Sequence, residues 1–66
     1  MNKEKHVYAY EGDVMHFDTV IERNWKAETF ATSEVKAKQN LKYRWREENG
    51  YSQTFKIELP DEIKMM

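Results

Sequence analysis

The stretch "TSEVKAKQNLKYRWREENG" (residues 32–50) decides the fold, because it carries both a start signal and a stop signal for a helix. Thr32 or Ser33 can accept hydrogen bonds from first-turn amides, and Glu34 complements the positive end of the helix dipole. Gly50 can take the left-handed conformation that closes a helix. The sequence therefore predicts a helix between these signals.

One side of this helix is expected to pack on a sheet. Ala37, Leu41 and Trp45 recur at i, i+4 and i+8, which aligns them on one narrow stripe. Leaving the Trp45 indole exposed would forfeit roughly 1.5–3 kcal/mol of burial free energy. We therefore predict that Trp45 is the central core residue. Tyr43 lies on the far side of the helical wheel, so it is either exposed or covered by another segment or chain.

Two strands and a tight turn are predicted near the amino terminus. "HVYAY" (6–10) is rich in β-branched and aromatic residues, and Gly12 in "EGD" can supply the positive φ of a hairpin turn. "VMHFDTVI" (14–21) then alternates as a half-buried strand does. Its more apolar face is expected in the core, and it consists of Met15, Phe17, Thr19 and Ile21.

A second turn and a third strand are predicted before the helix. "ERN" (22–24) contains Asn24, which tolerates the left-handed region. "WKAETFAT" (25–32) alternates less cleanly. Its two faces are Trp25, Ala27, Thr29 and Ala31 on one side, and Lys26, Glu28 and Phe30 on the other. Phe30 breaks the split, so either face can be the buried one.

After the helix, "SQTFKIEL" (52–59) is predicted as the last strand, with Phe55, Ile57 and Leu59 inward and Pro60 as its end. The element order is β-β-β-α-β. A right-handed crossover returns the last strand to the same sheet, beside the first or the third strand. The predicted fold class is α+β: a small two-layer domain with one helix packed on a mainly antiparallel sheet.

The length of 66 residues sets one domain, 1–66, in which residues 1–4 and 61–66 are expected to be loosely ordered. Hydrophobic residues make up 39% of the chain, enough for a small core but not for a core and a deep substrate cavity. There is no cysteine, so stability must come from packing, helped by self-association.

Charge and hydropathy limit the environment of the protein. The net charge of −1 attracts neither nucleic acid nor an acidic membrane. No apolar run approaches the roughly 20 residues that span a bilayer, and "MNKEKHVYAY" lacks the apolar stretch of a secretory signal. The expectation is a cytoplasmic protein that does not engage a membrane.

No pattern of catalytic or metal-binding residues emerges. His6 and His16 have no ligand spacing with Asp13 or Asp18. Two glycines cannot build a phosphate-cradling loop, and no nucleophile stands beside a base. The expectation is a non-enzymatic protein with no cofactor, no metal and no small-molecule substrate.

A basic stripe on the helix is the candidate contact surface. Lys38, Lys42 and Arg46 recur at i, i+4 and i+8. With Arg44 they can contact phosphates, and Tyr43 can stack on bases. Equally, the stripe can be an ordinary solvated helix face, and Glu47 and Glu48 reduce its local positive field.

The face of the sheet without a helix offers a second surface. Tyr8, Tyr10 and Phe30 are expected there. Exposed aromatic side chains on a sheet either stack on single-stranded nucleic acid or form a dimer interface. Because this chain lacks a basic excess, the dimer interface is favoured.

The second half of the chain resembles a group of known sequences. From Trp25 to Pro60, the Trp-led strand, the Thr-Ser-Glu helix start, "NLKY" (40–43), the Gly-closed helix and the "FKIELP" ending (55–60) resemble small uncharacterised proteins encoded by phages, prophages and mobile elements of Gram-positive bacteria. The resemblance implies a cytoplasmic accessory protein of a mobile element. It implies no activity and no functional residue.

Two functions follow as hypotheses. The first is a non-enzymatic accessory protein that binds another protein, with a homodimer as one form. The alternative is a nucleic-acid-binding module, and the residues proposed for the contact in either case are Lys38, Lys42, Tyr43, Arg44 and Arg46.

Overall fold

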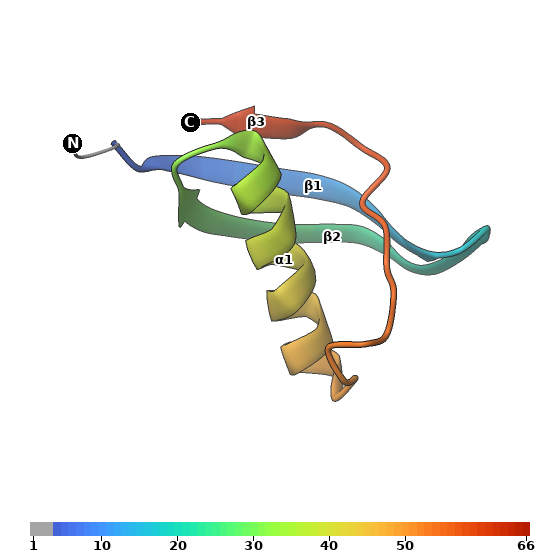
Figure 1. Ribbon diagram of the computed structural model, residues 1–66. Coiled ribbons are helices and arrows are strands. Elements are labelled where there is room, and N and C mark those ends of the chain that lie inside the picture. The colour runs from blue at the N-terminus through green and yellow to red at the C-terminus, as the bar shows by residue number, and fades with distance from the viewer. Residues whose placement is uncertain (1–3) are drawn as a thin grey trace.

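A computed structural model describes residues 4–66 and shows one helix lying across one face of a three-stranded antiparallel sheet (Figure 1). The predicted α+β two-layer class is confirmed. The sheet order is β2-β1-β3, so the first strand is central. The elements are β1 (His6–His16), β2 (Thr19–Ala31), α1 (Glu34–Asn49) and β3 (Ile63–Met65).

The helix begins and ends where the sequence predicted. Ser33 is the N-cap, and its hydroxyl oxygen accepts a hydrogen bond from the Lys36 N–H at 3.3 Å. Gly50 takes a φ of 75°, the left-handed conformation that glycine adopts without a steric cost. The Tyr51 N–H then donates to the carbonyl oxygen of Arg46 at 2.9 Å, which closes the last turn.

Trp45 is the core residue that the stripe predicted. It is 2% exposed, and Ala37 and Leu41 are buried beside it. Its indole N–H donates to the Glu22 carboxylate at 2.8 Å, so burial leaves no polar atom of the ring unpaired. The central cluster around it contains Tyr10, Val14, Trp25, Leu41, Trp45, Ile57 and Leu59.

The predicted hairpin turn at Gly12 is wrong, because β1 runs straight through it. Gly12 is needed for space: a Cβ there would lie 2.1 Å from a carboxylate oxygen of Asp61. That oxygen accepts a hydrogen bond from the Asp13 N–H at 3.0 Å. Beside it, the buried Tyr10 hydroxyl donates to the Asp13 carbonyl oxygen at 2.7 Å, and burial raises the pKa of Tyr10.

The predicted turn at 22–24 is also wrong, because the chain reverses at Phe17 and Asp18 instead. His16 pairs with Thr19, which leaves a two-residue loop between the strands. Asn24 does take a positive φ of 55°, as its residue type allows. It lies within β2 at a register irregularity, where two residues of β2 oppose one of β1, and this is a β-bulge rather than a turn.

The predicted core face of residues 14–21 is wrong for the same reason. Val14 is fully buried on the same side as Tyr8 and Tyr10, whereas Phe17 is 64% exposed. Because side chains alternate along a strand, the uninterrupted β1 keeps one set of alternate residues inward. The bulges in β2 leave Ile21 exposed.

The predicted last strand, 52–59, forms only one bridge. Met15 and Glu58 exchange backbone hydrogen bonds of 2.9 and 2.7 Å. Ile57 and Leu59 are buried as their alternation indicated. The third strand comes after Pro60, in the segment expected to be loosely ordered, where Ile63–Met65 pairs antiparallel with β1. Of the other expected loose end, residues 1–3 lie outside the described part.

Candidate interaction surfaces

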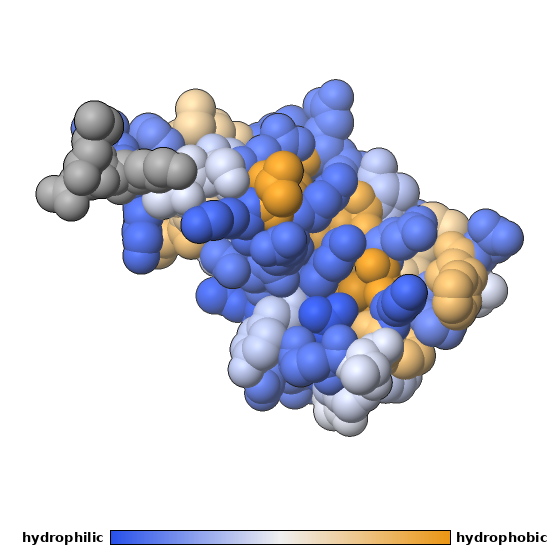
Figure 2. Space-filling view, viewed as in Figure 1, coloured by the Kyte–Doolittle hydropathy of each residue, from blue (hydrophilic) through white to orange (hydrophobic). Residues whose placement is uncertain are grey.

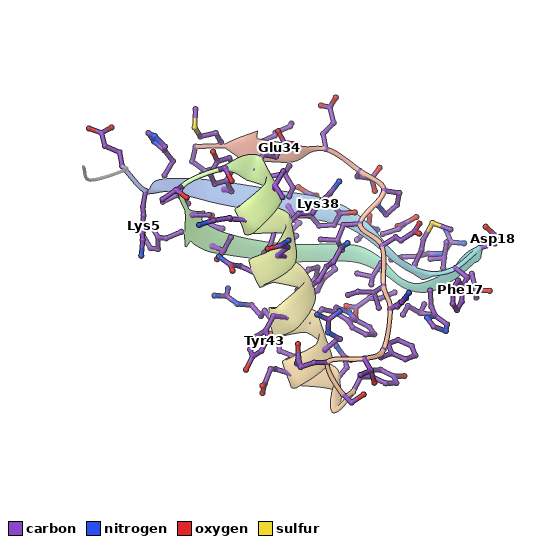
Figure 3. All side chains as sticks on the ribbon, viewed as in Figure 1. Lys5, Phe17, Asp18, Glu34, Lys38 and Tyr43 are labelled. Atoms are coloured by element: carbon purple, nitrogen blue, oxygen red, sulfur yellow. The ribbon has the colours of Figure 1, made fainter. Side chains whose placement is uncertain are left out.

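The five predicted contact residues do not form one surface. Lys42 and Arg46 line a groove between α1, the hairpin tip and residues 56–58. Tyr43 and Arg44 line a different groove, between α1 and β2. Lys38 lines neither of these two grooves. In Figure 3 the labelled Lys38 and Tyr43 come from opposite sides of the helix.

Arg44 is engaged in holding the outer edge of β2. Its guanidinium Nη1 donates to the Glu28 carbonyl oxygen at 2.6 Å, and the Asn40 side-chain amide donates to the Phe30 carbonyl oxygen at 3.3 Å. These two carbonyls face away from β1, on the side where another strand would otherwise pair. The helix therefore covers the edge with its own side chains.

Tyr43 lies beside an acidic residue. Its side chain is half exposed. The pKa of Tyr43 is raised, chiefly by a hydrogen bond between its hydroxyl and the Glu47 carboxylate and to a lesser extent by the negative charge of Glu47. Glu47 lines the same groove as Arg44. A phosphate placed there would meet a carboxylate, so this side of the helix does not favour an anionic ligand.

Arg46 fixes the chain that follows the helix. Its Nε and Nη2 atoms each lie 3.3 Å from the side-chain oxygen of Gln53, and Nη1 donates to the Phe55 carbonyl oxygen at 3.2 Å. The Arg46 guanidinium thereby holds the loop after the helix in place, and the Arg46 side chain also lines the groove.

A column of stacked rings runs from the helix end to the hairpin tip. Tyr51 stacks on Phe55, and Phe55 stacks on His16, each with ring centroids 4.2 Å apart and planes within 12°. His16 then meets Phe17 at 4.5 Å. The His16 ring nitrogen Nδ1 also donates to the Lys56 carbonyl oxygen. These contacts tie the hairpin to the segment after the helix.

The groove beside this column is open and basic. It encloses about 300 Å³ and is lined by Phe17, Lys42, Arg46, Lys56, Ile57 and Glu58. Within residues 4–66, the ion pair found joins Lys26 to Glu11, so neither Lys42 nor Lys56 is neutralised by a carboxylate at ion-pair distance there. Figure 3 shows Phe17 and Asp18 at the far end of the hairpin, and Figure 2 shows apolar surface toward that end of a largely hydrophilic side.

Sequence reasoning missed Phe17 and Lys56 as groove residues. Alternation placed Phe17 in the core, and no local signal marked residues 17–18 as a turn. Lys56 is exposed, as its alternation with Phe55 and Ile57 indicates, but no strand forms there, and its position beside Lys42 in the groove depends on how the chain returns from the helix. The sequence feature that could have indicated this region is the pair of aromatic residues Tyr51 and Phe55, which follow the helix four positions apart.

The helix-free face of the sheet carries an apolar row beside a charged row. Phe30 is 66% exposed and pairs with Val7 across β1 and β2. On the other side, the Met66 N–H donates to the Val7 carbonyl oxygen at 2.8 Å, which continues the row. In the next row, Ala9 lies between Glu28 on β2 and Lys64 on β3.

The tyrosines predicted on this face are not there. Tyr8 and Tyr10 point toward the helix and are buried, because they share the inward set of β1 with Val14. Phe30 is on the open face, and the buried face of β2 is the one with Trp25 and Ala31. The third row contains the exposed ion pair between Lys26 and Glu11, at 3.6 Å.

In the portion from residue 4 onward, no group of three or more His, Cys, Asp or Glu side chains is arranged to hold a metal ion. None of the helices in that portion has the length and apolar character needed to cross a bilayer.

Comparison with known proteins gives no relative for these surfaces. No family model, no curated protein and no solved structure matches the chain.

Proposed function

We propose that this protein is a non-enzymatic accessory protein that works by protein–protein binding through the helix-free face of its sheet, with a second copy of the chain as the partner. The observation that carries this proposal is the apolar row of Phe30, Val7 and Met66, in which Phe30 and Met66 are exposed. The sequence resemblance adds a proposed setting, the cytoplasm of a cell that carries a phage or mobile element.

The composition of the face supports an interface. An apolar centre with a charged surround is the usual anatomy of a protein interface. Phe30 and Met66 are large side chains that lie mostly in water in the single chain, and their burial against a partner would be favourable. Burial of these two side chains in a dimer would add stabilising free energy beyond that of the small core of one chain.

The charges on this face of one copy are complementary to the charges on the same face of a second copy. In a two-fold arrangement with its axis along β1, the β2 side of one copy lies over the β3 side of the other. Glu28 of one copy then faces Lys64 of the other, twice over. Phe30 faces Met66, and Val7 faces Val7 at the centre. Two Glu11 side chains also approach in this arrangement, each compensated by its own Lys26 at 3.6 Å.

The edges of the sheet are poor alternatives for self-pairing. The outer carbonyls of β2 at Glu28 and Phe30 already accept hydrogen bonds from Arg44 and Asn40. The outer strand β3 has only three residues, which gives a short ladder. Face-to-face packing is therefore the favoured mode of association.

A charge exchange tests the proposal. Glu28→Lys and Lys64→Glu each place like charges opposite one another in the two-fold dimer, so each variant alone is expected to be monomeric. Mixing the two variants restores two Glu–Lys pairs in one heterodimer. The measurement is sedimentation velocity at micromolar and higher protein concentrations, for each variant alone and for the mixture.

The design separates association from folding. Glu28 and Lys64 lie on β2 and β3 with β1 between them, roughly 10 Å apart within one chain, so they barely interact there. Glu48→Lys reverses a charge at an exposed position of α1, which lies on the other face of the sheet, and serves as the matched control that keeps the dimer. A monomeric wild-type chain, or a mixture that stays monomeric, contradicts the proposal.

Nucleic-acid binding stays as a second proposed function, with a changed location. The basic groove at Phe17, Lys42 and Lys56 favours it, whereas the surface around Tyr43 and Arg44 does not.

A further inference from the structure

We propose that the groove between the hairpin tip and α1 binds single-stranded nucleic acid, with Phe17 stacking on a base and Lys42 and Lys56 contacting phosphates. The proposal gives the groove a use that the dimer does not require. It deepens the second proposed function and is independent of the helix-free face.

The backbone of Phe17 is the first support. Phe17 has a φ of 55°, which is costly for a bulky side chain, on the order of 1–3 kcal/mol. The first position of a two-residue hairpin loop requires a positive φ and is normally glycine or asparagine. An aromatic residue at this position runs against that preference, and its ring lies mostly in water.

The position of the Phe17 ring is the second support. It lines the groove and packs against His16 at the end of the column of Tyr51, Phe55 and His16, with its plane tilted by 57° from the His16 ring. The column holds His16, and thereby the base of the turn, against the segment that follows the helix. An exposed aromatic ring that is held in a fixed position is a suitable platform for the stacking of unpaired nucleobases.

The charges of the groove are the third support. Lys42 comes from α1 and Lys56 from the returning chain, and Arg46 lies on the same wall. No carboxylate within residues 4–66 pairs with either lysine, although Glu58 lines the groove and reduces its positive field. The groove therefore combines two ammonium groups that can contact phosphates with an exposed ring that can stack on a base, the two kinds of contact that single strands use.

The sheet dimer would leave this groove accessible. Phe17 lies at the hairpin tip (Figure 3) and Lys42 belongs to α1, whereas Phe30 and Val7 pair with each other on the face of the sheet that the helix does not cover (Figure 1). A failure of one proposal is therefore distinguishable from a failure of the other.

The test measures binding of a fluorescein-labelled single-stranded oligo(dT) of about 15 nucleotides, a length near the upper end of single-strand site sizes. Fluorescence anisotropy is followed against protein concentration at several low salt concentrations. Phe17→Gly is expected to weaken binding on the order of tenfold, the effect of losing one stacked base. Lys42→Ala with Lys56→Ala is expected to lower the slope of log K against log salt by roughly 1.4, because each phosphate contact contributes about 0.7 on a single strand.

Weaker binding of Phe17→Gly would not be caused by unfolding, because glycine adopts the positive φ of position 17 without a steric cost. Phe17→Gly is expected to keep the circular dichroism spectrum and a thermal midpoint at least equal to that of the wild type.

Matched controls complete the experiment. Phe30→Ser removes an exposed aromatic ring from the opposite face, and Lys36→Ala with Lys38→Ala removes two helix lysines that do not line the groove. Both are expected to bind as the wild type does. The proposal is overturned if the wild type does not bind at low salt, if Phe17→Gly binds unchanged, or if the control lysine pair weakens binding as much as Lys42 and Lys56 do.

Discussion

Gly12 shows how one residue can be constrained by a segment far away in the chain. The turn-forming freedom of glycine plays no part, since Gly12 lies within β1. A Cβ would meet the Asp61 carboxylate at 2.1 Å and the Asp61 Cβ at 2.7 Å. Rotation of the Asp61 side chain cannot relieve the second contact, so the backbone after Pro60 would have to move.

We therefore expect Gly12→Ala to lower the free energy of unfolding by roughly 2–3 kcal/mol, in the range of overpacked sites. In an Asp61→Gly background the same substitution should cost much less, because both clashing groups are gone. Urea denaturation of the four proteins of this double-mutant cycle provides the measurement. Equal costs in the two backgrounds would show that the close approach is not what requires glycine.

At the scale of elements, the edge of β2 depends on α1. Asn40 and Arg44 lie one helical turn apart and reach two alternate carbonyls of the strand, Phe30 and Glu28. Four residues of a helix span nearly the same length as two residues of a strand, so the two contacts can form together. They hold the helix in one register along the edge. These side chains also occupy acceptors that another strand would use.

The double substitution Asn40→Ala, Arg44→Ala is expected to increase aggregation on gentle heating, because it uncovers the edge without altering the buried stripe of Ala37, Leu41 and Trp45. Light scattering during a temperature ramp measures the onset. Lys36→Ala with Lys38→Ala, which alters the same helix without touching these carbonyls, is the control. An unchanged onset in the Asn40 and Arg44 variant would contradict the protective role of these contacts.

For the whole molecule, surface is abundant relative to core. The accessible surface is 5015 Å² for a chain of 8.0 kDa. A compact monomer of this mass is expected to have about 4,450 Å². The long hairpin, which reaches beyond the helix in Figure 1, contributes to this large surface. A standard interface, roughly 800 Å² on each partner, would cover about one sixth of the surface.

Because the proposed dimer stabilises the folded chain by mass action, the thermal midpoint of the wild type is expected to rise with protein concentration. Glu28→Lys should abolish this dependence while leaving the midpoint at the lowest concentration nearly unchanged. Differential scanning calorimetry over a wide concentration range measures both. A wild-type midpoint that does not change with concentration would argue for a monomer under all these conditions.

The sequence by itself determined the helix, its two caps and its buried stripe, because these depend on interactions within four residues along the chain. It also determined that Ile57 and Leu59 lie inward and that the fold is a helix on a sheet. It misplaced the hairpin, since Gly12 and Asn24 satisfy local turn rules yet serve a close approach and a bulge.

Only the tertiary structure decided which residues share a surface. Lys42 and Arg44 are two positions apart on one helix but line different grooves, and Phe17 and Lys56, 39 positions apart in the chain, line the same groove. The alternation of side chains along a strand decides which of them face the core once the position of the turn is known, and the strand that leads to this turn contacts Asp61 through Asp13 and Phe55 through His16. Such contacts join distant segments, so no local pattern in the sequence records them.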